Sequence, residues 1–356
     1  MQNMTQKVLS GERGNTVPTR RQFIRTASAV SAGVLAGRYC TIADAEETGP
    51  AQHEKAQIAI TLDLEMSRNF PNWEDRHWDY EKGNLNQAAK DYTGKVCRRV
   101  RARGGIVHNF VVGRVFEQAN VDWLKEIAAA GHPIGNHTYD HVYVLAKSVE
   151  ELQYRFRRAP WLLRDRSVLE VIRDNIKLTD RALQLGIGIE SNGFRTPGGF
   201  NKGLNGHVEI QELLLELGYR WVSSKYPGHS GMENLHGTGR APSQEAFDSI
   251  VRAQRAAQPF VYPTGLVEIP MSPLSDIVAF RTGRWKLKHF LNAIELSLQW
   301  VIENSAVFDF LAHPSCLGVV DEKCQAIDLI CDMVDQANGS AEIVGLDVIA
   351  ARTQAN

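Results

Sequence analysis

The chain has 356 residues and a formal net charge of −1, with 43% hydrophobic and 23% charged residues. This length allows one large or two ordinary domains, and the near-neutral balance lacks the basic excess typical of nucleic-acid-binding proteins. The first 45 residues hold six Lys/Arg against two Asp/Glu, so the rest of the chain is mildly acidic. A basic leader before an acidic body is typical of an exported protein, and no nucleic-acid partner is expected.

Residues 1–45 have the pattern of an export signal. Arg20 and Arg21 precede Phe23 and a modestly apolar run, 26–37. Paired arginines before a weak hydrophobic segment resemble a twin-arginine signal, and small residues predict cleavage after Ala45. The run is too short and polar to cross a membrane. We therefore expect a soluble mature protein in the periplasm or outside the cell, exported by the twin-arginine translocation machinery. The alternative is an ordinary disordered basic N-terminus.

Residues 46–56 are polar and predict a linker, and one domain is expected over 57–356. In this domain, apolar runs that resemble strands alternate with segments of helical period. The expected strands are 58–64, 106–112, 133–135, 188–194, 219–223, 266–271, 307–312 and 343–348. The expected helices are 86–103, 122–130, 149–156, 169–185, 208–217, 287–304 and 321–336. This alternation predicts an α/β fold with a parallel sheet, and about eight units predict its closure into a barrel.

Two segments depart from the alternation. Residues 68–83 place four aromatic side chains in a polar loop, and Trp73 and Trp78 are expected to stack on sugar rings. The alternative is a loop folded over its own small apolar core. Residues 224–260 are polar and rich in glycine, and they predict an insertion near the rim of the barrel. Neither histidine of that insertion is expected to bind a metal.

The chain has five cysteines, of which Cys40 would leave with the export signal. Buried free thiols are expected for Cys97, Cys316, Cys324 and Cys331. The alternative is a Cys316–Cys324 bridge that would steady the loop after the seventh expected strand.

Two histidines, His137 and His141, stand four residues apart after a short expected strand. On one face of a helical turn, both rings would reach a single ion. Asp63 and Glu65, at the end of the first expected strand, offer a carboxylate as third ligand. This set suits Zn²⁺, with Co²⁺, Ni²⁺ or Mn²⁺ as alternatives, and leaves a coordination position open for water, as in metal hydrolases. A pair of this spacing also arises by chance.

Nearby polar residues are expected to support this motif. Asn136 and Thr138 are expected to shape the turn between the two histidines, and Asp140 to cap it. His108 and His132 are expected to be structural, because one lies within a strand and the other precedes a proline at a strand start.

Two further motifs follow in chain order: Arg195-Thr196-Pro197-Gly198-Gly199, and Leu311-Ala312-His313. With the strand-end acids and the histidine pair, this order resembles the polysaccharide deacetylases, the NodB-homology domain of carbohydrate esterase family 4. The resemblance runs from about residue 57 to residue 349. It implies a distorted (β/α) barrel of seven or eight strands, of the glycoside hydrolase/deacetylase type, in agreement with the barrel expected from the alternation.

The resemblance also implies roles for the two acids. The first motif of this family usually reads Thr-Phe-Asp-Asp-Gly, where the first Asp is the base and the second a metal ligand. Here it reads Thr61-Leu62-Asp63-Leu64-Glu65, so Leu64 replaces the second Asp. Asp63 is therefore expected to be the general base and Glu65 a metal ligand beside His137 and His141. The reverse assignment of the two acids is left open.

Four more residues take roles from the resemblance. Arg195 is expected to pair with Asp63 and keep it ionised. His313 is expected to protonate the departing amine as general acid. Pro197 and Gly198 are expected to shape a substrate-binding loop whose backbone N–H faces the developing oxyanion. The alternatives are a structural salt bridge elsewhere for Arg195 and a buried structural role for His313.

Together these expectations predict that the protein is a metal-dependent hydrolase that removes N-acetyl groups from an extracytoplasmic polysaccharide. One alternative keeps the same site but cleaves a small C–N substrate, as the related allantoinase-like and polyamine deacetylase-like proteins do. The expected export argues against purine catabolism in the cytoplasm. The other alternative is a carbohydrate-binding barrel without catalysis, although every expected catalytic and ligand residue is present.

Overall fold

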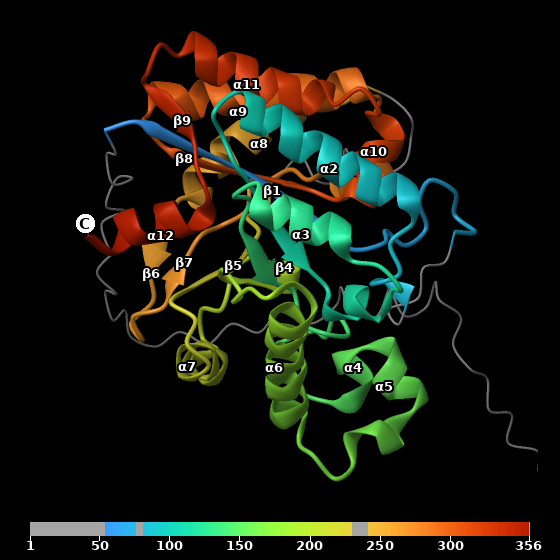
Figure 1. The fold of residues 1–356 in the computed structure, drawn as a ribbon. Coiled ribbons are helices and arrows are strands. Elements are labelled where there is room, and N and C mark those ends of the chain that lie inside the picture. The colour runs from blue at the N-terminus through green and yellow to red at the C-terminus, as the bar shows by residue number, and fades with distance from the viewer. Residues whose placement is uncertain (1–53, 76–80, 230–240, 356) are drawn as a thin grey trace, which may run out of the picture. The chain divides into compact units, whose positions relative to one another are not determined.

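The computed structural model describes residues 54–75, 81–229 and 241–355, all within one compact unit, Thr48–Asn356 (Figure 1). The export signal, most of the expected linker, Trp78 and His236 lie outside the described residues. None of the described helices is long and apolar enough to cross a membrane.

The unit is built on one curled, mixed sheet. Its strands are β1 (Ala56–Leu64), β2 (Val107–Val111), β3 (Ile134–Asn136), β4 (Phe194–Phe200), β5 (Trp221–Lys225), β6 (Phe260–Val261), β7 (Val267–Glu268), β8 (Val307–Ala312) and β9 (Ala341–Ile343). They pair in the order β6-β7-β5-β4-β3-β2-β1-β8, and β9 also pairs with β1. Among the described strands, every pair is parallel except β6 with β7. The parallel sheet predicted from the alternation is confirmed.

The sheet curls toward a barrel that strand pairing leaves open between its two end strands, β6 and β8. Within the described residues these strands do not pair, and side chains span the gap instead. The amides of Gln254 and Gln258 donate to the carbonyl of Val307, and Gln258 accepts from its N–H. One backbone bond, from Ser272 N to the carbonyl of Asp309, also crosses the gap. The expected barrel is therefore a distorted half-barrel.

Helices cover the outside of the sheet. The longer ones are α2 (Gln87–Ala102), α3 (Asp122–Ala129), α6 (Val168–Ile187), α7 (Val208–Glu216), α8 (Gln244–Ala253), α9 (Leu287–Glu303), α11 (Gln325–Gln336) and α12 (Leu346–Ala355). The shorter ones are η2 (Gly113–Glu117), α4 (Val149–Leu152), α5 (Tyr154–Arg158), η3 (Pro160–Leu163), η5 (Gln254–Ala257), the π-helix η6 (Ile277–Thr282) and α10 (Pro314–Val320). In Figure 1, α2, α9 and α11 form a layer on one side of β1, and α6 and α7 lie on the other side of the molecule.

Local sequence explains why these helices begin and end where they do. Ser167 and Glu170 form a capping box at the start of α6, and Gly188 ends it in the left-handed conformation. β1 is buried along its whole length because β2, β8 and β9 flank it and helices cover it. Its only polar side chains before the site, Gln57 and Thr61, are therefore fully buried.

Four of the expected elements were placed wrongly. The strand expected at 188–194 is found at Phe194–Phe200, because the stretch before it connects α6 to the sheet. The strand expected at 343–348 ends at Ile343, and α12 begins at Leu346. The helix expected at 149–156 breaks at Gln153, whose backbone is extended. The helix expected at 321–336 begins at Gln325, because Asp321 accepts the N–H groups of its first residues.

The segment 224–260 is also more regular than expected. It contains α8, which places Phe247 and Ile250 in the main hydrophobic core beside α9. The segment 224–260 therefore contributes a helix, α8, that covers the sheet, and is not only an insertion at the rim. The cysteines agree with their prediction: Cys97, Cys316, Cys324 and Cys331 are buried, and all four are free thiols.

Candidate metal centre

The candidate site lies where strands end. Asp63 is the penultimate residue of β1 and Glu65 directly follows this strand, while His137 follows β3 and His313 follows β8. Because the carboxyl ends of parallel strands meet at one face of such a sheet, these side chains converge there. Together with His141 they line one cavity of about 300 Å³. The structure thus brings together both expected acids, the two histidines expected to bind metal, and the histidine expected to act as general acid.

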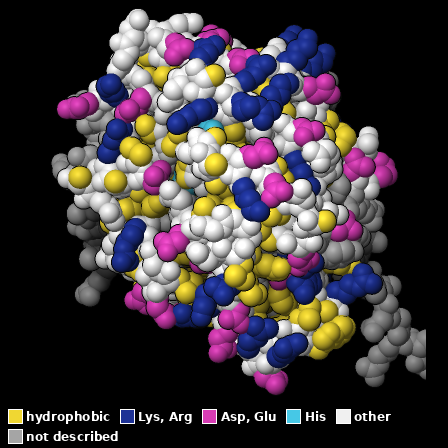
Figure 2. Space-filling model, viewed as in Figure 1, with side chains coloured by type: hydrophobic (Ala, Val, Ile, Leu, Met, Phe, Trp, Pro, Cys, Tyr) yellow, Lys and Arg dark blue, Asp and Glu magenta, His cyan; other side chains and the backbone are white. Residues whose placement is uncertain are grey.

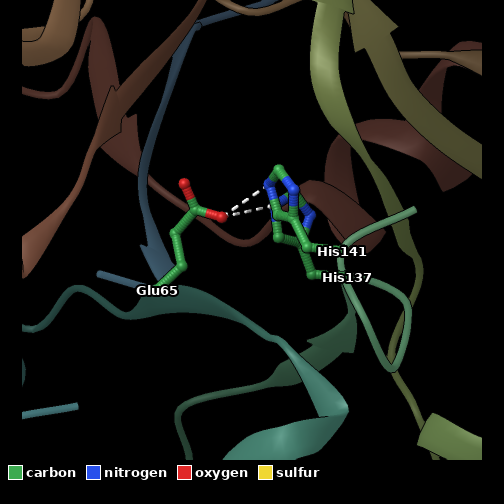
Figure 3. A group of neighbouring side chains, drawn as sticks. All are labelled: Glu65, His137 and His141. Atoms are coloured by element: carbon green, nitrogen blue, oxygen red, sulfur yellow. Dashed lines mark ion pairs between the residues drawn. The ribbon is translucent and has the colours of Figure 1, made fainter. Parts of the chain in front are cut away.

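Glu65, His137 and His141 form a cluster that could hold a metal ion, with ligand atoms all within 4.8 Å of one another (Figure 3). Glu65 Oε2 lies 2.6 Å from His141 Nε2 and 3.8 Å from His137 Nε2. The short contact lacks hydrogen-bond geometry, and Oε2 is buried without a hydrogen-bond partner among the described residues. Two imidazole nitrogens and an unsatisfied carboxylate oxygen at these distances fit a divalent cation.

The hydrogen bonds behind the cluster favour the same conclusion. His137 Nδ1 lies 2.9 Å from the carbonyl of Arg195, which can only accept, so Nδ1 donates and Nε2 faces the cluster. Burial lowers the pKa of His137 to about 4, which keeps the ring neutral, as a metal ligand must be.

Glu65 is held in the charged form. Burial alone would raise its pKa, but the charges of His141 and Lys82 hold the pKa of this carboxyl well below its usual range. Lys82 Nζ lies 2.6 Å from Glu65 Oε1, so one carboxylate oxygen is engaged and the other faces the imidazoles. No role was predicted for Lys82, because it lies at the end of the aromatic loop expected to bind sugar.

The two histidines do not lie on a helical turn, which corrects one expectation. They lie at the two ends of the loop 137–141, in which the backbone of Thr138 and of His141 is left-handed, with φ of 58° and 57°. Asn136 supports the loop as expected: its amide donates to the carbonyl of Ile176, and its oxygen accepts from Thr138 N. The rings meet with centroids 5.0 Å apart because the loop folds back on itself.

Asp140 does not cap this loop. Its carboxylate is buried and binds two arginines, Arg114 of η2 at 3.0 Å and Arg155 of α5. Its backbone N–H is held by the side chain of Asn175 in α6. Three separate elements are therefore fixed to the residue next to His141.

Arg195 has a different main partner from the one expected. Its guanidinium is fully buried, and Nη2 lies 2.5 Å from Asp309 of β8, whereas Nη1 lies 3.5 Å from Asp63. Nη1 also donates to Thr61 at 3.0 Å. Arg195 thus reaches Asp63 from a site anchored by Asp309. An acid inside the apolar strand Val307–Ala312 was the signal for this partner, because a buried charge requires a counter-ion.

His313 is oriented by an acid that the sequence analysis did not identify. Its Nδ1 lies 2.9 Å from Asp276, which also accepts the backbone N–H of His313. Its Nε2 faces the cavity, 3.9 Å from Asp63 and 3.8 Å from Glu65. Burial lowers the pKa of His313, but the neighbouring Asp276 carboxylate outweighs it, so the net pKa is raised. Asp276 lies 37 residues away, at the start of η6, and carries no motif.

The part of β4 that follows Arg195 borders the cavity, although a loop was expected there. Gly198 has a φ of 79° and lines the cavity, while Pro197 lines a second, adjoining cavity. Trp73 is 63% exposed and lines neither cavity, so the structure does not bring it to the site.

The two histidines that were expected to be structural, His108 and His132, have structural contacts. His132 Nδ1 accepts from Val107 N at 2.9 Å. His108 Nε2 lies 2.8 Å from the carbonyl of Asn192, and Nδ1 accepts from Leu346 N.

Comparison with known proteins agrees with this geometry. Residues 79–222 match the sequence model of the family described as polysaccharide deacetylase. The matched segment contains His137, His141 and Arg195, whereas Asp63, Glu65 and His313 lie outside it. No curated protein matches the chain.

Solved structures share the fold at low identity. A Mycobacterium smegmatis protein described provisionally as a polysaccharide deacetylase has a TM-score of 0.57 and 16% identity, covering 86% of this chain and 94% of its own. A Pseudomonas aeruginosa PAO1 protein with a similar description has a TM-score of 0.54 and 13% identity, covering 84% and 91%. Puue allantoinase has a TM-score of 0.56 and 14% identity, covering 90% and 99%. Residues 79–222 thus match the model of this family, and the three solved structures share the fold of this chain.

Proposed function

We propose that the protein is a metal-dependent hydrolase that removes N-acetyl groups from an extracytoplasmic polysaccharide. The observation that carries the proposal is the cluster of Glu65, His137 and His141, which lies in the same cavity as Asp63 and His313. The matched family segment supports a deacetylase.

Glu65, His137 and His141 would hold the metal, with Zn²⁺ favoured by the donor set and Co²⁺, Ni²⁺ or Mn²⁺ as alternatives. A bound divalent ion supplies a Lewis acid and a water of lowered pKa. Glu65 Oε1 stays with Lys82, so Glu65 would bind through Oε2 alone.

Asp63 is the proposed general base. It is buried beside the cluster, 3.8 Å from His137 Nε2, and the Arg195 guanidinium stabilises its charge. His313 is the proposed general acid that protonates the departing amine from Nε2. Asp276 fixes the tautomer and orientation of this ring. The backbone around Gly198 is proposed to stabilise the developing oxyanion.

The direct test is acetate release from a panel of N-acetylated polymers, including peptidoglycan and chitin-like substrates. We expect release that requires added metal and stops with a chelator. Absence of release from every polymer, in protein that has bound metal, would overturn the proposal and favour a carbohydrate-binding barrel without catalysis.

Two variants separate ligand from acid. His141→Ala should lose metal and activity together, whereas His313→Ala should keep metal and lose turnover. Equal loss of metal in both variants would show that these two roles are assigned wrongly.

A second candidate is a small-molecule C–N hydrolase of the same fold. The observation that favours it is the shared fold with Puue allantoinase, since the matched region covers 99% of that protein. Assays with allantoin and with N-acetylated polyamines test it, and turnover of these substrates without release from any polymer would support it over the polysaccharide.

Export is a separate part of the proposal, and it rests on residues 1–45. Fusion of this segment to a folded reporter should direct the reporter across the membrane. Replacement of Arg20 and Arg21 by Lys should retain the reporter in the cytoplasm. Unchanged export of that variant would exclude the twin-arginine route.

A further inference from the structure

A cavity of about 700 Å³ lies between α2 and α3, two neighbouring helices on the outside of the sheet (Figure 1). None of its described lining residues belongs to the cavity of the metal centre, so the two cavities are separate. Its volume is within the range of about 300–1,000 Å³ that small-molecule sites occupy. The groups in its wall indicate which kind of ligand it can bind.

The inner wall of this cavity is apolar. Cys97 of α2 and Ile127 of α3 are buried, and Trp123 of α3 is partly buried. Burial raises the pKa of the Cys97 thiol to about 12, so this side chain is neutral. Gly94, in the middle of α2, adds no side chain to the wall. Such a wall favours a ligand with an apolar body.

His132 provides an unused hydrogen-bond donor in the wall. Its Nδ1 accepts from Val107 N, so the proton of the neutral ring is on Nε2. Burial and the charge of Arg101 lower the pKa of His132, which keeps the ring neutral. The residue is 2% exposed, and Nε2 is buried without a hydrogen-bond partner among the described residues. A buried donor of this kind is costly unless a ligand satisfies it.

The indole of Trp123 provides a second unused donor. Its Nε1 can only donate, and it is also buried without a hydrogen-bond partner in the described part of the chain. Buried indole N–H groups usually have a partner. Both unsatisfied groups in the wall are donors, so the matching ligand presents acceptor atoms.

The charged residues around the cavity are mainly basic. Lys90, Arg98 and Arg101 of α2 line it, against two acids, Asp91 and Glu126. Figure 2 shows Lys and Arg side chains around the part of this face that holds α2 and α3, with acidic and hydrophobic side chains among them. The excess of positive charge favours an anion over a cation.

The three basic residues of the cavity are not neutralised within the described part of the chain. Arg99 and Arg103, which face α11, form ion pairs with acids of that helix. No ion pair of the described residues engages the three that line the cavity. Arg101 Nη1 lies 3.8 Å from the position that a Cβ atom on Gly131 would take. Its guanidinium therefore reaches from α2 to the end of α3, beside His132.

We propose that this cavity binds a small organic carboxylate with an apolar body. The carboxylate accepts from His132 Nε2–H and Trp123 Nε1–H, and Arg101 stabilises its charge. The apolar body lies against Cys97 and Ile127. The site is independent of the proposed function, because the metal centre contributes no group to it.

The test uses octanoate and phenylbutyrate as probes, with octanol as the uncharged match for octanoate. Calorimetry is done on the full chain after chelator treatment, so that a carboxylate cannot bind a metal ion instead. Trp123→Phe removes one donor and keeps an aromatic ring. Arg101→Gln removes an exposed charge. Arg103→Gln is its matched control, because Arg103 lies at the end of the same helix but does not line the cavity.

We expect both carboxylates to bind the wild-type protein more tightly than octanol does. Trp123→Phe should weaken octanoate binding about tenfold, because a hydrogen bond to a charged group is lost. Arg101→Gln should weaken it about twofold to fivefold, since this charge is exposed. Arg103→Gln should match the wild type.

The indole N–H signal of Trp123 gives a second, direct readout. In the NMR spectrum of isotope-labelled protein, this signal is identified by its loss in Trp123→Phe, and it should shift when octanoate is added. The inference would be overturned if neither carboxylate binds, if octanol binds as tightly as octanoate, or if Trp123→Phe leaves octanoate affinity unchanged. Equal weakening by Arg101→Gln and Arg103→Gln, or a Trp123 signal that does not respond to octanoate, would also overturn it.

Discussion

Glu65 has two carboxylate oxygens in different surroundings. Oε1 is paired with Lys82, and Oε2 faces His137 and His141 without a hydrogen-bond partner in the described part of the chain. Asp63 instead has Oδ1 paired with Arg195, and its Oδ2 lies 3.8 Å from His137 Nε2 but outside the cluster of Glu65, His137 and His141. This asymmetry favours Glu65 over Asp63 as the metal ligand, the assignment that the sequence left open.

A pair of conservative variants tests that assignment. Mutation of a residue that only supports a metal ligand typically lowers metal affinity about 10–100-fold. Glu65→Gln should weaken Zn²⁺ binding by more than this, because it removes the charge of a ligand. Asp63→Asn should keep most of the affinity and lose turnover. Titration with a competing chelator measures both constants, and the opposite order would exchange the two roles.

The pair of His313 and Asp276 gives a prediction about pH. The Asp276 carboxylate raises the pKa of His313, so the protonated ring persists to higher pH. In Asp276→Asn this pKa should fall, and the alkaline limb of the kcat/KM profile should move to lower pH, while metal content stays unchanged. A profile that keeps its alkaline limb would show that His313 is not the acid that this limb reports.

The sequence identified residues that carry a motif. Asp63, His137 and His313 were found because each follows an apolar strand in a recognisable order. Lys82 and Asp276 were not, since their roles depend on segments that meet only in the folded chain. Asp309 was identifiable in principle as an acid within an apolar strand, but its partner, Arg195, had been paired with Asp63.

At the level of elements, the loop after β3 depends on supports from η2, α5 and α6. Asp140 accepts from Arg114 and Arg155, whose side chains are 18% and 33% exposed. Breaking a buried ion pair costs about 3–5 kcal/mol, and partial exposure reduces the figure here to about 2 kcal/mol.

Asp140→Asn should therefore lower the free energy of unfolding by about 2 kcal/mol and weaken metal binding about tenfold, because His141 is the next residue. Asp122→Asn removes an exposed pair with Lys125 and should change stability by less than about 1 kcal/mol. Denaturant unfolding and metal titration measure both effects. Metal affinity that is unchanged in Asp140→Asn would mean that the loop does not need this anchor.

Gly193, at the entry to β4, gives a prediction about packing. Its φ is 81°, and a Cβ atom there would lie 1.8 Å from the ring of Trp221. Gly193→Ala should destabilise the fold by at least about 2 kcal/mol, because both the clash and the left-handed backbone oppose it.

Gly188 is the matched control for this prediction. Its φ is 73°, but a Cβ atom would meet nothing within 4 Å. Gly188→Ala should therefore cost only the backbone term, about 1–2 kcal/mol. Equal destabilisation of the two variants in urea would show that the contact with Trp221 is relieved by movement of the ring.

Elements were predicted best from the sequence where a hydrophobic pattern of helical period is long and capping residues mark both ends of the helix. α6 is such a case, with a capping box at Ser167 and a C-terminal glycine. Prediction failed where contacts with distant segments decide whether a stretch forms a strand. β4 lies on Phe194–Phe200, a stretch with two glycines and a proline, because pairing with β3 and β5 holds it extended.

For the whole molecule, the alternation of strands and helices correctly predicted an α/β sheet curled toward a barrel. The opening between β6 and β8 was not predictable, since it is bridged by the side chains of Gln254 and Gln258. The site lies across the sheet, and its ligands come from residues 65 to 141. A bound cation should thus link distant parts of the chain and stabilise the native state.

The most direct measurement of the central claim is the thermal unfolding of metal-free protein with increasing Zn²⁺, for the wild type and for His141→Ala. At free metal about 100 times the Kd, the wild type should gain about 2.7 kcal/mol of stability. The Tm of the variant should stay where it was without metal. A wild-type Tm that does not respond to Zn²⁺, Co²⁺, Ni²⁺ or Mn²⁺, or an equal response in the variant, would contradict the metal centre proposed at Glu65, His137 and His141.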